Sequence, residues 1–125
     1  MSVELEHVSR SVDGIATIRD VSLTLDRGTL SVLLGPTLSG KTSIMRLLAG
    51  LDKPTSGRVL VDGKDVTGAD VRRRSVAMVY QQFINYPSLS VYENIASPLR
   101  VQGKPRAEIE KRVQEAAGLL KLEPI

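Results

Sequence analysis

Residues 33–43 read LLGPTLSGKTS, and within them Gly35 to Thr42 satisfy the phosphate-loop spacing G-x-x-x-x-G-K-[ST] in full. The apolar run Leu30–Leu34 leads into this loop and predicts a buried strand covered on both faces. The apolar residues after the loop recur at helical spacing: Ile44, Leu47, Leu48 and Leu51. Strand, loop and helix therefore follow one another in the order that a phosphate-binding loop requires.

The residue types in this loop suit the binding of a triphosphate. Glycines let the chain turn tightly enough to aim successive backbone N–H groups inward, and the following helix presents its positive end to the same place. Lys41 can reach the β- and γ-phosphates, and the Thr42 hydroxyl can join the ligands of a magnesium ion. A chance meeting of a Gly- and Ser-rich turn with a lysine is the alternative, and the strand and helix on either side argue against it. The candidate binding set is Gly35, Pro36, Thr37, Leu38, Ser39, Gly40, Lys41, Thr42 and Ser43.

Leu38 is the irregular residue of the loop, because such loops often carry glycine there. If the backbone at this place needs a left-handed conformation, a side chain with a β-carbon costs about 1 to 2 kcal/mol. Either the loop bears that strain, or it relaxes and binds nucleotide less tightly. The side chain itself could pack over the helix or point to solvent.

The composition is that of a folded chain. Hydrophobic residues make up 42% of the 125 residues and charged residues 25%, which predicts one domain or a piece of one. Only 3% of residues are aromatic, which leaves few side chains to stack on single-stranded nucleic acid and disfavours an RNA-binding module. The basic run Arg72-Arg73-Arg74 is interpreted as a solvated edge in preference to a nucleic-acid patch. The chain has no cysteine, which excludes disulfides and a thiolate nucleophile. No apolar run approaches the length of a membrane span, so we expect any action at a membrane to be from the side.

The remaining chain predicts strands first and helices later. Antiparallel strands are expected before the loop, with turns at residues 12–14 and 26–28, and a hairpin is expected around Asp62-Gly63. Val76–Val79 predicts a further buried strand. Ser90 can cap a helix that runs toward Leu99, and a last helix follows Pro105. One face of that last helix is predicted from its apolar residues Ile109, Val113, Ala116, Leu119 and Leu120.

Two longer segments carry a family resemblance. They are LGPTLSGKTSIMRLLAGLDKPTSGRVLVDGKDVT, residues 34–67, and VAMVYQQFINYPSLSVYENIASPL, residues 76–99. Together they resemble the ATP-binding subunit of ABC transporters, in particular the ATPases of bacterial carbohydrate and polyol importers, and the second is most similar to the glycerol type. The resemblance implies an α/β fold, the N-terminal part of an ABC-type P-loop NTPase. Antiparallel strands and a partial central sheet with the phosphate-loop helix would form an ATP-binding core over residues 1–89, and residues 90–125 would begin a helical subdomain.

The resemblance also assigns roles to residues outside the loop. Gln81 matches the glutamine that contacts magnesium and the attacking water, so Lys41 and Gln81 are the candidate catalytic residues, and Thr42 and Gln81 the candidate metal ligands. Val12 stands where the family commonly stacks an aromatic ring on adenine, which implies that adenine is bound more weakly or by another group. Phe83–Val91 resembles the surface that receives the membrane partner, although its apolar residues could be routine packing. His7, the only histidine, is expected to be structural or exposed.

The implied function is energy coupling by ATP hydrolysis with Mg²⁺ in an importer. The expected partners are transmembrane permease subunits and a second ATPase subunit, at the cytoplasmic face of the inner membrane, with no nucleic acid. The family's signature sequence, its Asp-Glu strand end and its switch histidine do not occur in the chain. We therefore expect a fragment that binds nucleotide and does not hydrolyse it alone. One alternative is a module that only binds or self-associates. Another is a non-transport ABC ATPase, against which YPSLSVYENI, residues 86–95, argues.

Overall fold

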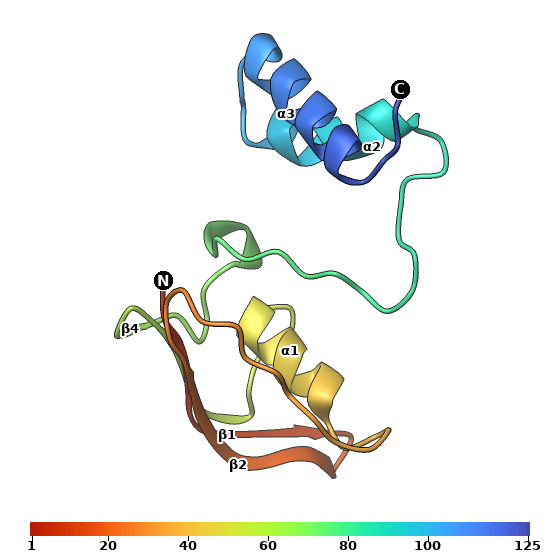
Figure 1. Ribbon diagram of the computed structural model, residues 1–125. Helices are drawn as coiled ribbons and strands as arrows, with labels where there is room; N and C mark the ends of the chain where they lie inside the picture. The colour runs from red at the N-terminus through yellow and green to blue at the C-terminus, as the bar shows by residue number, and fades with distance from the viewer. The chain divides into compact units, whose positions relative to one another are not determined.

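The computed structural model describes all residues 1–125, and the chain divides into two compact units, Met1–Val79 and Tyr80–Ile125 (Figure 1). The predicted boundary between residues 89 and 90 stays a prediction. The elements of the first unit are β1 (Val3–Val12), β2 (Ile15–Leu25), α1 (Lys41–Ala49), β3 (Ser56–Val61), β4 (Lys64–Asp65) and the 3₁₀ turn η1 (Val71–Arg73). Those of the second are α2 (Val91–Val101) and α3 (Arg106–Leu119).

The first unit is an antiparallel sheet in the order β2-β1-β3-β4, with α1 beside it. The turn between β1 and β2 is Asp13-Gly14, with φ angles of 50° and 77°. The hairpin between β3 and β4 turns at Asp62-Gly63, with φ angles of 49° and 78°. Asp-Gly is well suited to such turns because both central residues need a positive φ. Both turns were predicted at these positions, and both are confirmed.

A bulge interrupts the alternation of buried residues in β1 and in β2. Leu5 and Val8 are both fully buried although they are three residues apart, because the register shifts between them and His7 adopts a φ of 48°. Asp20 in β2 has a φ of 45°, and its Oδ1 lies 2.8 Å from Nδ1 of His7. Ile15–Leu25 is therefore one strand with an irregular residue inside it.

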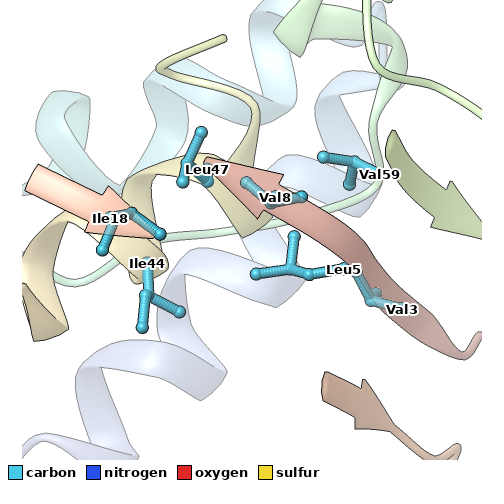
Figure 2. Packing of buried hydrophobic residues seen from close by; sticks show 7 residues of the cluster. All are labelled: Val3, Leu5, Val8, Ile18, Ile44, Leu47 and Val59. Atoms are coloured by element: carbon cyan, nitrogen blue, oxygen red, sulfur yellow. The ribbon is translucent and has the colours of Figure 1, made fainter. Parts of the chain in front are cut away.

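The core of the first unit lies between the sheet and one face of α1. Figure 2 shows side chains from β1, β2, α1 and β3 pointing toward one another. Leu47 of α1 is fully buried against this cluster, and Ile44, one turn earlier, is nearly so. The cluster consists of Val3, Leu5, Val8, Ile18, Ile44, Leu47 and Val59. Helical spacing after the loop thus predicted the buried face of α1 correctly, and that packing holds the phosphate loop against the sheet.

The strands expected at Leu30–Leu34 and Val76–Val79 are not formed. Both segments are irregular chain outside the sheet, and Leu30 and Val79 expose 94% and 96% of their surface. A strand is stabilised by hydrogen bonds to a neighbouring strand, and no strand of the β2-β1-β3-β4 sheet pairs with either segment. The α/β class, the antiparallel strands and the phosphate-loop helix are confirmed, whereas these two strands of the partial central sheet were predicted wrongly.

The second unit is a pair of packed helices. Ser90 caps α2 as predicted, since its Oγ accepts a hydrogen bond from the Glu93 N–H at 3.1 Å. Ala96 of α2 packs against Ile109 and Val113 of α3. The buried face of α3 continues to Ala117, while Leu119 and Leu120 are exposed, so the end of the predicted apolar face was wrong. A spacing of four residues from Ile109 keeps a side chain on the face toward α2. None of the helices has both the length and the hydropathy that a membrane span requires.

Candidate phosphate-binding site

The phosphate loop ends in the first turn of α1. Gly40 is the N-cap residue with a φ of 91°, and its carbonyl oxygen accepts the first helical hydrogen bond, from the Ile44 N–H at 3.0 Å. No side chain caps this end, and the first turn contains no acidic residue. The N–H groups of Lys41, Thr42 and Ser43 have no partner within the helix, because the first N–H groups of any α-helix lack one. The end of α1 therefore presents donors and positive potential to an anion.

Lys41 places its ammonium group over the loop that precedes it. Nζ donates hydrogen bonds to the carbonyl oxygens of Gly35 at 2.6 Å and Pro36 at 2.5 Å, and to Ser39 Oγ at 3.3 Å. Gly35 leaves room for the Ser39 hydroxyl, because a β-carbon at Gly35 would lie 2.8 Å from Ser39 Oγ. The loop and the first helical residue thus enclose one positive charge at the mouth of the site.

The loop rests directly on the sheet at Gly40. A β-carbon at this position would lie 2.9 Å from Cδ1 of Ile18 and 3.2 Å from the carbonyl oxygen of Thr17, both in β2. The positive φ of Gly40 is a second reason for glycine. Two independent constraints therefore demand the second glycine of the motif.

Leu38 has the left-handed conformation that the sequence left open. Its φ is 64°, and its side chain is 100% exposed. The side chain therefore points to solvent and makes no packing contact that could offset the strain of a β-carbon in this conformation. A hydrogen bond from the Ser39 N–H to the Pro36 carbonyl oxygen, at 3.3 Å, closes the turn around Leu38.

The predicted metal ligand and base-binding residue occupy separate places. Thr42 is exposed in the first turn of α1, and Ser43 beside it is half-buried. Magnesium usually takes only one or two protein ligands and completes its shell with phosphate oxygens and waters, so an exposed hydroxyl at this end of α1 fits that role. Val12 lies at the end of β1, paired with Ile15, and is partly exposed. Gln81 is exposed in the second unit, and its part in the site stays a prediction.

Sequence reasoning missed a residue at the other end of α1. Arg72 and Arg73 are exposed, as expected of a solvated edge, but Arg74 is partly buried. Its Nη1 donates to the carbonyl oxygens of Leu47 at 3.3 Å and Leu48 at 3.4 Å, and its Nη2 donates to that of Val66 at 2.6 Å. Burial lowers the pKa of the Arg74 guanidinium from its usual range. No local signal separates the third arginine of the run from the first two, because its partners lie 8 to 27 residues away in sequence.

A second set of charges holds the segment that follows α1. Arg46, in the last turn of α1, binds Asp52, and Nη2 of Arg10 lies 3.7 Å from the same carboxylate. Arg10 Nη1 also donates to the Lys53 carbonyl oxygen at 2.5 Å. The chain that leaves α1 is thus tied back to both α1 and β1.

Comparison with known proteins decides the family. The family described as ABC transporter matches residues 18–125, which include the phosphate loop, α1 and both helices of the second unit. The chain belongs to the ABC transporter family. The ABC chain is similar to curated ATP-binding proteins named for import. It is 41% identical over 121 residues to "Fe(3+) ions import ATP-binding protein FbpC 1" of Pectobacterium atrosepticum, covering 97% of this chain and 34% of that protein.

Another relative of this chain carries a different name. It is 39% identical over 121 residues to "Spermidine/putrescine import ATP-binding protein PotA" of Aggregatibacter actinomycetemcomitans, covering 97% of this chain and 32% of that protein. The ABC chain therefore spans about a third of the length of the curated relatives it matches.

A solved structure confirms the ABC fold. It is described as a dimeric post-hydrolysis state of the ATP-binding cassette MJ0796 bound to ADP and Pi. The TM-score is 0.84 at 29% identity, over 98% of the ABC chain and 58% of the solved chain. The predicted resemblance to the ATP-binding portion of ABC transporters is thereby confirmed.

Proposed function

We propose that the chain is the phosphate-binding part of an energy-coupling ATPase subunit of an ABC importer, and that it binds Mg²⁺ and ATP through residues 35–43. The observation that carries this proposal is the arrangement at the start of α1. Lys41 Nζ lies within 2.6 Å of two loop carbonyl oxygens, beside the uncapped helix end. The start of α1 therefore presents the Lys41 ammonium group, the helix N–H donors and the Thr42 hydroxyl to a bound triphosphate.

Each group at this place has a distinct part in binding. The loop N–H groups and the first turn of α1 receive phosphate oxygens, and Lys41 neutralises their charge. Thr42 would help to hold Mg²⁺, which would supply positive charge beside the phosphates. Gln81 is proposed to orient the attacking water, because an amide can donate and accept hydrogen bonds without adding charge.

The transported substrate is proposed from the names of the relatives. Those reported above are named for import of Fe(3+) and of spermidine or putrescine, so the expected carbohydrate or polyol finds no support in them. We infer a cationic cargo, with iron(III) as the first candidate, because several relatives share that name. The proposed partners are permease subunits and a second ATPase subunit, which places the protein peripherally at the cytoplasmic face of the membrane.

A second candidate function is self-association without turnover. It is favoured by the apolar segments that remain outside the sheet, where Leu30 and Val79 are almost fully exposed. Exposed apolar chain with free backbone groups can pair with another copy. A rise in molar mass with concentration, measured by light scattering in the absence of nucleotide, would support this candidate.

The decisive test of the proposed function is a titration of the chain with Mg²⁺ and ATP. Lys41→Ala should weaken binding by about tenfold or more, because a charge-assisted contact to phosphate is lost. Lys64→Ala, at an exposed lysine in β4, is the matched control and should leave the affinity unchanged. Circular dichroism checks that each variant keeps its fold. Absence of saturable binding, or equal affinities for the wild type and Lys41→Ala, would refute nucleotide binding through this loop.

A further inference from the structure

We propose that Arg74 is a positioning residue for the phosphate site and acts through the far end of α1. The inference rests on the proposed function, since it concerns the site that α1 presents to phosphates. Arg74 does not lie at the loop. It holds the C-terminal end of the nine-residue helix whose N-terminal end forms the site.

The contacts of Arg74 join α1 to the sheet. One nitrogen of the guanidinium donates to the carbonyl oxygens of Leu47 and Leu48, and another donates to the carbonyl oxygen of Val66. Val66 is itself fixed to the sheet, because its N–H donates to the Val59 carbonyl oxygen of β3 at 2.8 Å. One side chain therefore ties the last turn of α1 to the β3–β4 hairpin.

Gly50 makes room for this guanidinium. A β-carbon at Gly50 would lie 2.7 Å from Nε and 2.8 Å from Cδ and Cζ of Arg74. Gly50 also ends α1 with a φ of 79°, and its N–H donates to the Leu47 carbonyl oxygen at 3.2 Å. The end of the helix is thus shaped to receive Arg74 as well as to terminate.

The charge of Arg74 suits the end of the helix at which it lies. The last carbonyl groups of an α-helix have no partner within the helix and carry partial negative charge, so a cation there is stabilising. Burial of the guanidinium has a cost, because Nε is buried without a hydrogen-bond partner, and the three hydrogen bonds from Nη1 and Nη2 offset part of that cost. Since a short helix moves largely as a rigid body, fixing its last turn also fixes the direction of its first N–H groups.

The neighbouring arginine provides a matched control. Arg72 is exposed, two residues earlier, and carries the same charge, but its side chain makes none of these contacts with α1. Arg72→Gln and Arg74→Gln therefore remove the same charge from the same segment. Arg74→Lys keeps the charge but loses the planar fork that reaches several carbonyl groups at once.

The experiment measures binding of Mg²⁺-ATP and of inorganic pyrophosphate to the chain and its variants by calorimetry. Arg74→Gln should weaken both ligands by a similar factor of about 3 to 10, because phosphate contacts are shared between them. Arg74→Lys should restore part of the affinity, and Arg72→Gln should leave it unchanged. Val3→Ala, a core change in β1, controls for a general loss of stability. If the two variants lose the same melting temperature, Val3→Ala should weaken binding less than Arg74→Gln does.

Three results would overturn the inference. They are an unchanged affinity in Arg74→Gln, an equal loss in Arg72→Gln, or an equal loss in Val3→Ala. If the wild-type chain binds neither ligand, the proposed function fails, and amide hydrogen exchange then tests the anchor by itself. Faster exchange of the α1 amides in Arg74→Gln than in Arg72→Gln would support Arg74 as the anchor of α1. Equal exchange in the two variants would refute that role.

Discussion

Arg46 binds Asp52 through two parallel hydrogen bonds, from Nε to Oδ2 at 2.9 Å and from Nη2 to Oδ1 at 3.1 Å. The Asp52 side chain exposes only 17% of its surface, and Arg10 of β1 adds a second positive charge nearby. The hydrogen bond from Arg46, aided by the charges of Arg10 and Arg46, lowers the pKa of Asp52 from its ordinary value of 3.8. Asp52 therefore holds the segment after α1 against α1 through Arg46 and against the sheet through Arg10.

Asp52→Asn should lower the free energy of unfolding by about 1 kcal/mol at neutral pH, because a paired, charge-assisted contact is lost. A carboxyl group whose pKa is depressed in the folded state stabilises the fold above its unfolded pKa, and that contribution is lost as the pH falls through the folded pKa. The difference between wild type and variant should therefore be full above about pH 5 and shrink below pH 3.8. Urea unfolding at several pH values measures it. A difference that stays constant with pH would contradict the charge pairing.

Leu38→Gly should stabilise the chain. The left-handed conformation of Leu38 costs about 1 to 2 kcal/mol, and the greater flexibility of unfolded glycine takes back about 0.5 to 1 kcal/mol, which leaves a net gain below roughly 1.5 kcal/mol. Leu38→Ala is the matched control, because it removes the exposed side chain and keeps the β-carbon. Chemical unfolding compares the two. Equal stabilities of Leu38→Gly and Leu38→Ala would show that the conformation carries no strain.

Gly40→Ala should disrupt the phosphate loop more than a positive φ alone would. Gly28 has a φ of 74° with no atom within 4 Å of an added β-carbon, whereas the added β-carbon at Gly40 would meet Ile18 and Thr17. Gly28→Ala should cost about 1 kcal/mol in unfolding free energy, and Gly40→Ala should cost about 1 kcal/mol more. Only Gly40→Ala should also weaken binding of Mg²⁺-ATP. Equal costs in the two variants would mean that the loop does not rest on β2 as described.

Tyr92→Phe should raise the pKa of Glu110. Tyr92 Oη donates a hydrogen bond to Glu110 Oε2 at 2.6 Å, and this bond, with a second from Gln114, lowers the pKa of Glu110 below its ordinary value. The same bond to Glu110 raises the pKa of Tyr92. The bond therefore stabilises the second unit above the unfolded pKa of Glu110, and that contribution disappears as the pH falls through the folded value. NMR titration of the Glu110 carboxyl carbon in both proteins measures the change, and identical titrations would show that the bond is absent in solution.

Local patterns in the sequence predicted those parts of the fold whose causes are local. The Asp13-Gly14 and Asp62-Gly63 turns, the Ser90 cap and the buried face of α1 each depend on residues a few positions apart. The bulges at His7 and Asp20 were missed, because a single irregular residue inside a strand is defined by its cross-strand partner. The strand prediction at Leu30–Leu34 failed for a related reason. An apolar run indicates that a segment is suited to burial, but a strand also needs a neighbouring strand to pair with, and none pairs with this segment.

The sequence by itself determined the chemistry of the loop, from Gly35 to Thr42, because each required residue type is written at its own position. The tertiary structure alone decided what surrounds that chemistry. It placed Leu38 in a left-handed conformation with its side chain in solvent, rested Gly40 on β2, and brought Arg74 to the far end of α1. These relationships join residues that are distant in sequence, or depend on backbone angles that most residue types can adopt at some cost. They follow from the close packing of side chains from several elements, so no local pattern in the sequence reveals them.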